Sequence, residues 1–268
     1  MLSVERSGYY VWLKRKSSKR QQENDVLDEK IITIFKSHKS RYGAPRIMDE
    51  LQEKKEICSK NRVARRMIHL NLRAKAKKKY KVTTDSKHNL PVAPNLLNRN
   101  FIAHAPNQKW CGDITYVWTD EGWMYLAVVI DLFSRAVIGW SIQSTMSREL
   151  VCDALMMALW RRRFPRNVLF HSDRGSQYCS GDYQKMLKHY GFICSMSRKA
   201  NCWDNAVAES FFHSFKTELV YTERYTTREI AKQSIFQYLE VYYNRVRRHS
   251  AIGSVAPEVF ENQCQKVI

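Results

Sequence analysis

The last two thirds of the chain alternate strand and helix patterns, and their order restricts the possible folds more than any other feature. Three strand patterns come first, and the short connections between them predict an antiparallel meander. They cover residues 108–118, 123–133 and 135–143. Helices and strands then alternate over residues 147–163, 167–171, 182–190, 192–196, 204–219 and 227–243. This order predicts an α/β fold, in which a mixed sheet has helices on both faces.

Three acidic residues stand in three different elements of this pattern. Asp113 lies in the first strand, Asp173 lies where a later strand ends in a loop, and Glu209 lies in a helix. Carboxylates that are brought together repel one another unless cations lie between them. Oxygen ligands favour Mg²⁺ or Mn²⁺ over zinc, and no Cys/His cluster has the spacing of a zinc site. The three acids therefore predict a site for two divalent ions that serves phosphoryl transfer on nucleic acid.

The positive charge is concentrated at the start of the chain. Residues 1–100 carry 25 Lys or Arg against 10 Asp or Glu, whereas residues 101–268 carry 20 against 16, within a total net charge of +19. Such a basic segment is typical of proteins that bind nucleic acid phosphates, although it could also be a solubilising tail. No apolar stretch reaches 18 residues and no signal peptide is apparent, so we expect an intracellular protein that does not cross a membrane.

The basic part is divided into a lead-in, residues 1–24, and a helical domain, residues 25–79. Helix patterns near residues 25–39, after Pro45 and after the N-cap Ser59 predict a helix-turn-helix module. A generic three-helix bundle with a solvated basic face is the alternative. The side chains expected to contact DNA are Lys60, Arg62, Arg65, Arg66 and Arg73.

A linker is expected over residues 80–100, which have little to bury and should be extended or mobile. The lysines just before it could follow a DNA backbone, and they are Lys77, Lys78 and Lys79. The catalytic core, residues 101–268, ends in a basic tail in which arginines and aromatic residues alternate. That composition suits a DNA strand, although a solvated helix end would look the same. The arginines are Arg245, Arg247 and Arg248.

The helix that carries Glu209 has two distinct faces. One face presents Asn205, Glu209, His213 and Lys216, whereas the other presents Val207, Phe211 and Phe215 and should pack on the sheet. Asn205 and His171 are candidates for hydrogen bonds to the acids, with plain packing as an equal alternative for His171. Asp131 is expected to serve a turn rather than a metal, and Trp203 to lie in the core rather than to stack on a base.

Four motifs resemble the catalytic core of insertion-sequence transposases, which is similar to that of retroviral integrases. They are Trp110-Cys111-Gly112-Asp113-Ile114-Thr115, His171-Ser172-Asp173-Arg174-Gly175-Ser176-Gln177-Tyr178, Asp204-Asn205-Ala206-Val207-Ala208-Glu209-Ser210-Phe211-Phe212 and Tyr243-Asn244-Arg245-Val246-Arg247-Arg248-His249-Ser250. The chain most resembles the second open reading frame product (OrfB) of the IS-three family. The resemblance implies an RNase H-like fold, the DDE triad Asp113, Asp173 and Glu209, and a basic residue seven positions after the glutamate, Lys216.

The resemblance also implies an activity and its partners. A transposase of this family would cut and join DNA at the terminal inverted repeats of its element, with two Mg²⁺ or Mn²⁺ ions per active site and without ATP. Pairing two DNA ends implies at least a dimer, and an upstream partner (OrfA) is expected, often as a fusion. The resemblance further implies a bacterial protein of the cytoplasm that associates with the nucleoid. The alternatives are an RNase H-like nuclease or resolvase that only hydrolyses, and a DNA-binding regulator without catalysis.

Overall fold

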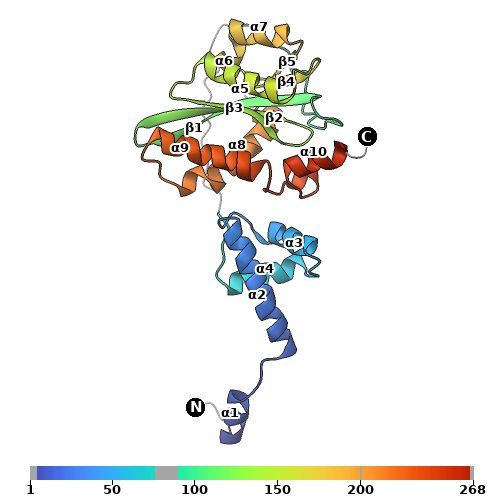
Figure 1. The fold of residues 1–268 in the computed structure, drawn as a ribbon, viewed down its shortest axis with the longest axis vertical. Coiled ribbons are helices and arrows are strands. Elements are labelled where there is room, and N and C mark those ends of the chain that lie inside the picture. Colours follow the sequence, from blue (N-terminus) through green and yellow to red (C-terminus); the bar gives the residue numbers. More distant parts are fainter. Residues whose placement is uncertain (1–4, 76–89, 200, 266–268) are drawn as a thin grey trace. The chain divides into compact units, whose positions relative to one another are not determined.

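The computed structural model describes residues 5–75, 90–199 and 201–265. The chain forms two compact units, residues 1–76 and 77–268. Figure 1 shows the helices of the first unit and the sheet of the second. Among the described residues, every helix is too short or too polar to cross a membrane.

The first unit is entirely helical and agrees with the expected helix-turn-helix-like domain. Its helices are α1 (Arg6–Leu13), α2 (Lys19–Ser37), α3 (Ala44–Glu53) and α4 (Lys60–His69). Helix α2 begins inside the expected lead-in because the Ser18 side chain caps it, accepting a hydrogen bond from the Gln21 amide at 3.2 Å. Pro45 stands in the first turn of α3, and Ser59 caps α4. The buried apolar side chains join the last three helices and include Leu27, Ile31, Ile47, Leu51 and Val63.

The second unit is built on a five-stranded mixed sheet, as the sequence predicts. Its strands are β1 (Lys109–Thr119), β2 (Gly122–Asp131), β3 (Val137–Gln143), β4 (Leu169–Ser172) and β5 (Ile193–Met196). They lie in the order β3-β2-β1-β4-β5. The first three form the expected antiparallel meander, whereas β4 pairs in parallel with both β1 and β5. Parallel pairing needs long crossovers, which the intervening helices provide.

Helices cover both faces of the sheet (Figure 1). One face carries α5 (Arg148–Arg161), α6 (Ser176–Cys179) and α7 (Gly181–His189), and the other carries α8 (Ala206–Glu218) and α9 (Arg228–Phe236). Helix α9 continues as a π-helix, Gln237–Tyr243, and α10 (Pro257–Gln265) follows. The sequence patterns missed α6, which has only four residues, and α10. Helix α5 lies so close to β3 that a Cβ on Gly139 would come 2.2 Å from the Ala154 carbonyl oxygen.

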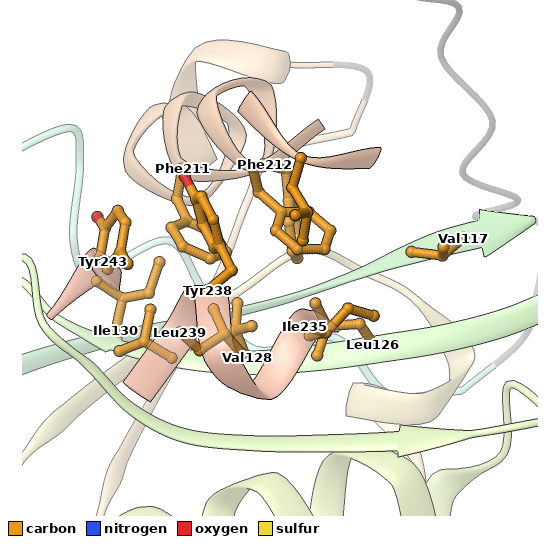
Figure 2. Close-up of a cluster of buried hydrophobic side chains, with 14 of the residues drawn as sticks. Val117, Leu126, Val128, Ile130, Phe211, Phe212, Ile235, Tyr238, Leu239 and Tyr243 are labelled. Carbon is orange, nitrogen blue, oxygen red and sulfur yellow. The ribbon is translucent and has the colours of Figure 1, made fainter. Parts of the chain in front are cut away.

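The apolar cluster beneath α8 and α9 fixes the position of α8 (Figure 2). Phe211 and Phe212 of α8 lie with Tyr238, Leu239 and Tyr243 over the strands. The expectation for Phe211 and Phe215 is confirmed, because both are buried. Val207 is partly buried and packs against the same cluster, as expected, and the packed face of α8 also includes Ala208. Glu209 is therefore held beside a firmly packed residue, Ala208, on an exposed part of the helix.

Residues 90–100 differ from the extended or mobile linker that the sequence suggested. Leu97 is buried against the core of the second unit. The amides of Leu96 and Leu97 both donate to the Ser195 hydroxyl, at 2.9 and 3.1 Å. Asn95 and Arg99 donate to the carboxylate of Asp204 at 2.9 and 3.0 Å. These contacts make residues 90–100 part of the second unit.

Candidate active site

Asp113 and Asp173 lie at matching positions on neighbouring parallel strands. The last paired residues of β1 and β4 are Cys111 and His171, and each aspartate follows two positions later. Paired residues on parallel strands point to the same face, and neighbouring strands are about 4.8 Å apart. Cys111 packs in the cluster under α8, so the period of two places Asp113 on the side of the sheet that α8 covers.

Local hydrogen bonds orient one oxygen of each aspartate. Asp113 Oδ1 accepts from the Ile114 amide at 2.8 Å, and Asp173 Oδ1 accepts from the Gly175 amide at 2.9 Å. Both side chains are half-buried. Glycine suits position 175 because a larger residue would place its Cβ only 3.1 Å from Asp173 Oδ1, which is closer than most Cβ contacts in proteins. The turn after β4 therefore holds the second carboxylate in place.

Glu209 completes the acidic group from the first turn of α8. The three acids lie within electrostatic range, since burial first and then Asp173 and Glu209 raise the pKa of Asp113 well above its usual value. Burial also raises the pKa of Glu209. Lys216 opposes the effect on Asp113, because its positive charge favours the carboxylate. Such a mutually repelling acidic group is one that a cation would stabilise.

The carboxylate oxygens of these acids are the ligand type that a hard divalent cation prefers, but they do not surround a common point on all sides. Within the described part of the chain, no three His, Cys, Asp or Glu side chains lie close enough together to hold a metal ion. Mg²⁺ commonly binds through one or two carboxylates and completes its shell with water and substrate phosphates. Asp113 and Asp173 match that requirement, and Glu209 stands on the helix that faces them.

Lys216 is more buried than a phosphate ligand was expected to be. Its Nζ lies 4.4 Å from the centroid of the Tyr116 ring, as a cation–π contact. Burial lowers the pKa of Lys216, and Asp113 counteracts that effect. In this conformation the ammonium group of Lys216 contacts the Tyr116 ring and stabilises the negative charge of Asp113.

His171 and Asn205 do not bond to the acids in the way the sequence suggested. The His171 ring is buried, with Nδ1 2.9 Å from Ser195 Oγ and Nε2 3.2 Å from Ser197 Oγ, so it ties β4 to the end of β5. Burial lowers the pKa of His171 to about 4, so the ring is neutral at physiological pH. Asn205 is buried just before α8, and its Oδ1 has no hydrogen-bond partner among the residues described.

Asp204 is a structural anchor that the sequence patterns did not single out. Its fully buried carboxylate accepts from Arg198 Nε and Nη2 at 2.9 and 2.8 Å and from Arg99 Nε at 3.0 Å. The Arg198 guanidinium, its backbone amide and Arg99 hold the pKa of Asp204 well below the usual range. This network fixes the 3₁₀ turn Cys202–Asn205 from which α8 begins. Arg198 is six residues from Asp204, but Arg99 is 105 residues away, so the sequence near the helix start could not show this second partner.

Two other expectations for single residues have clear outcomes. Asp131 serves a turn, as expected, because its carboxylate accepts from the Phe133 and Asn107 amides at 3.0 and 2.9 Å. The expectation that Trp203 lies in the core is wrong, since 69% of its surface is exposed.

The basic side chains of the first unit fall into two groups. Lys60, Arg65 and Arg73 are exposed, as a DNA contact requires. Arg66 instead donates to both carboxylate oxygens of Asp28 in a largely buried pair, and Arg62 donates to Asn24 at 3.0 Å. Both arginines join α4 to α2. The buried pair with Asp28 speaks against Arg66 as a DNA contact, whereas Arg62 keeps a side-chain exposure of 35% and its DNA contact stays a prediction. The lysines Lys77, Lys78 and Lys79 lie outside the described residues.

The three arginines of the basic tail also differ from one another. Arg245 is exposed and forms a surface ion pair with Glu258 at 3.3 Å. Arg248 is half-buried and donates to the Ser254 carbonyl at 2.8 Å. Arg247 is only 3% exposed and donates to Glu218 at 2.8–3.0 Å and to Ser214 at 3.0 Å. This corrects the expectation that Arg247 contacts DNA, because its guanidinium is buried and paired with Glu218.

Comparisons with known proteins agree with this architecture. Residues 103–202 and 209–264 match two family models that are both described as integrase core domains, and residues 21–80 match an HTH-like domain. A chain in the cryo-EM structure of the simian T-cell lymphotropic virus intasome, in complex with the PP2A regulatory subunit B56 gamma, is similar in fold. It has a TM-score of 0.51 at 15% identity, over 81% of this chain and 74% of that one.

Curated relatives extend over nearly the whole sequence. The transposase InsF for insertion sequence IS3A of Escherichia coli (strain K12) is 52% identical over 265 residues, which cover 98% of this chain and 92% of InsF. An uncharacterized 31 kDa protein of insertion element IS600 from Shigella sonnei is 43% identical over 263 residues, 98% of this chain and 97% of that protein. The chain therefore belongs to the IS3 family of insertion-sequence transposases, enzymes with an integrase catalytic core.

Proposed function

We propose that this transposase cuts and joins DNA at the terminal inverted repeats of its element, with Asp113, Asp173 and Glu209 as the catalytic acids. The observation that carries the proposal is the register of β1 and β4, in which each aspartate follows the last paired residue by two positions. The raised pKa of Asp113, which burial causes first and the neighbouring acids Asp173 and Glu209 increase, supports it as well, because a bound cation would stabilise such a carboxylate.

The same acids would hold Mg²⁺ or Mn²⁺, with two ions per site as the expected number. When bound, such ions supply Lewis-acid stabilisation of the charge that develops on the attacking and leaving oxygens. The chain contributes the placement of its carboxylates: the Gly175 amide orients Asp173, and the Ile114 amide orients Asp113. Lys216 adds a positive charge beside Asp113. Placement and charge are the main protein contributions to phosphoryl transfer.

Two steps follow from this arrangement. In the first, water attacks a phosphodiester, the P–O bond to the departing 3′ oxygen breaks, and a strand with a 3′-OH is released. In the second, that 3′-OH attacks another phosphodiester, so that one P–O bond forms as one breaks. Neither step requires ATP because the bonds exchanged are of similar kind. A nuclease or resolvase that only hydrolyses would perform the first step alone.

Asp113→Asn tests the catalytic assignment. The variant keeps the size of the side chain but removes its charge, so cleavage and strand transfer should fall on the order of a thousandfold or more, because the ions that the reaction requires would lose a ligand. DNA affinity should stay unchanged. The matched control is Asp182→Asn, which alters an exposed acid paired with Arg148 on the surface. Assays use a labelled, pre-cut transposon end together with an uncut one. Undiminished cleavage by Asp113→Asn contradicts the proposal, and hydrolysis without joined product favours the nuclease.

The partners form part of the proposal. The first unit, with exposed Lys60, Arg65 and Arg73, would bind the DNA ends through phosphate contacts. Joining two ends would require at least a dimer, and an OrfA partner would contribute to end recognition. Association with the bacterial nucleoid would follow from the DNA binding.

A further inference from the structure

A pocket lined by aromatic side chains lies at the end of the β1–β2 hairpin. Its volume is about 350 Å³, and the segment that follows α8 forms one of its walls. Tyr116, Trp118, Trp123 and Tyr221 supply the aromatic surface, and Lys216 and Arg224 supply the positive charge. All of these residues belong to the second unit.

The aromatic rings of β1 and β2 form a ladder across the two strands. Trp118 pairs with Trp123 in the antiparallel register, and their ring centroids are 4.8 Å apart at an interplanar angle of 74°. Tyr116 meets Trp123 edge-to-face at 5.0 Å. Trp118 and Trp123 remain 54% and 45% exposed, and neither belongs to the buried clusters on the two faces of the sheet. Their exposed rings are therefore available to a partner.

The cations that line the pocket lie next to its aromatic rings. Lys216 Nζ lies over the Tyr116 ring at 4.4 Å, and Arg224, whose side chain is 83% exposed, also lines the pocket. Asp120 and Glu223 line it as well, so the formal charges of the lining cancel: Asp120 pairs with Arg224 at 3.1 Å, and Glu223 accepts from Ser234 Oγ at 2.6 Å. Aromatic rings next to cations are the usual surface for unpaired bases.

Lys216 connects the pocket with the catalytic acids. It lines the pocket beside Tyr116, and its positive charge opposes the rise in the pKa of Asp113 that burial causes, so it lies within electrostatic range of that carboxylate. Tyr116 follows Asp113 by three residues on β1, about 10 Å along an extended strand, and the alternation of the strand directs the two side chains to opposite sides of it. Within the described chain, the pairing of β1 with β4 ends at Cys111. The part of β1 beside the pocket therefore has an unpaired edge on that side.

We propose that this aromatic pocket binds an unpaired base of the DNA end, which stacks on the Trp118–Trp123 ladder while a phosphate beside it meets the exposed guanidinium of Arg224. The inference rests on the proposed function for the nature of the substrate. Removing one base from the duplex would open the end close to the carboxylates. A protein segment or a second copy of the chain would use the rings differently, without preference for bases.

Binding of short oligonucleotides tests this inference on the full chain, with EDTA present so that no reaction takes place. The probes are a labelled oligothymidylate of about eight nucleotides and an abasic oligomer of equal length and charge, compared by fluorescence anisotropy. Trp118→Ala should weaken binding of the oligothymidylate on the order of 5- to 100-fold, as expected for one lost stacking contact. Binding of the abasic oligomer should not change, and Trp118→Phe should recover most of the loss. The control is Trp160→Ala, which removes an indole that is 68% exposed on α5 and should leave both affinities unchanged.

Crosslinking gives an independent test that does not depend on a variant. Irradiated oligothymidylate with a single 5-iodouracil should attach to Trp118, Trp123 or Tyr116, as located by mass spectrometry. The inference is overturned if Trp118→Ala weakens both probes equally, weakens neither, or shifts only the oligomeric state in sedimentation. Because these measurements need neither metal nor cleavage, a failed base pocket leaves the catalytic proposal intact. Conversely, if Asp113→Asn cleaved DNA normally and the catalytic proposal failed, the preference for bases in these binding measurements would not change.

Discussion

The buried pair between Arg247 and Glu218 yields the sharpest prediction about the stability of the catalytic unit. Arg247 donates three hydrogen bonds of 2.8–3.0 Å to the Glu218 carboxylate, and the Tyr238 hydroxyl donates a further one at 3.0 Å. Arg247→Met keeps an apolar stem of similar length but leaves the charge of Glu218 buried without its cation. Breaking a buried pair in this way costs about 3–5 kcal/mol, a large part of the stability of an ordinary domain.

The assay is urea unfolding of the full chain followed by tryptophan fluorescence. Six of the seven tryptophans lie in the second unit, so the signal reports mainly on that unit. The control is Arg245→Met, which removes an exposed ion pair with Glu258 and should cost at most about 1 kcal/mol. The double variant Arg247→Met/Glu218→Gln should recover on the order of 2 kcal/mol, because the uncompensated charge is gone.

The refuting result is equally specific. If Arg247→Met unfolds at the same urea concentration as the Arg245→Met control and loses DNA affinity instead, the guanidinium serves DNA and not the fold. Equal effects of the single and double variants would also contradict the reasoning, because they would mean that Glu218 is not left uncompensated.

Further predictions concern packing, pH and charge. Gly139→Ala should lower the free energy of unfolding by about 1–3 kcal/mol or more, because its Cβ would meet α5; Gly181→Ala, which meets nothing within 4 Å, should not, as urea unfolding would show. The depressed pKa of Asp204 means that its stabilisation is fully present above the unfolded pKa of about 3.9 and is lost as the pH falls below that value. The stability advantage of the wild type over Asp204→Asn, measured by urea unfolding at a series of pH values, should therefore shrink below about pH 4; an advantage that grows there contradicts this sign. Without divalent ions, Asp113→Asn should raise the melting temperature, because the variant no longer buries a charge beside two other acids. Added Mg²⁺ should stabilise the wild type more than the variant in a thermal-shift assay, and equal shifts would contradict this.

Local patterns predicted the strands, most helices and the elements that carry the acids. They worked because the period of each strand and helix is a local property, and because Asp113, Asp173 and Glu209 stand in clear strand and helix contexts. The outcome for the arginines was not local. Arg245, Arg247 and Arg248 belong to one basic run. Arg247 alone of the three is buried, because it contacts Glu218, which lies 29 residues earlier in the sequence.

The same reason explains the error over residues 90–100. Their Asn and Pro content resembles a linker, and only Ser195 and Asp204, about a hundred positions later, make them part of the fold. The helix pattern also placed Lys216 on the side of Glu209, but it could not show that Tyr116 lies beneath its ammonium group. Tertiary partners therefore decide which basic residues remain available to DNA.

Crystals of the full chain soaked in Mn²⁺ would test the central claim most directly, through anomalous diffraction at the manganese absorption edge. We predict an anomalous peak between the carboxylates of Asp113, within β1, and Asp173, just after β4, that disappears in Asp113→Asn. A peak at another acidic cluster, or no peak here even with a DNA end bound, would contradict the assignment of these acids as the metal-holding centre.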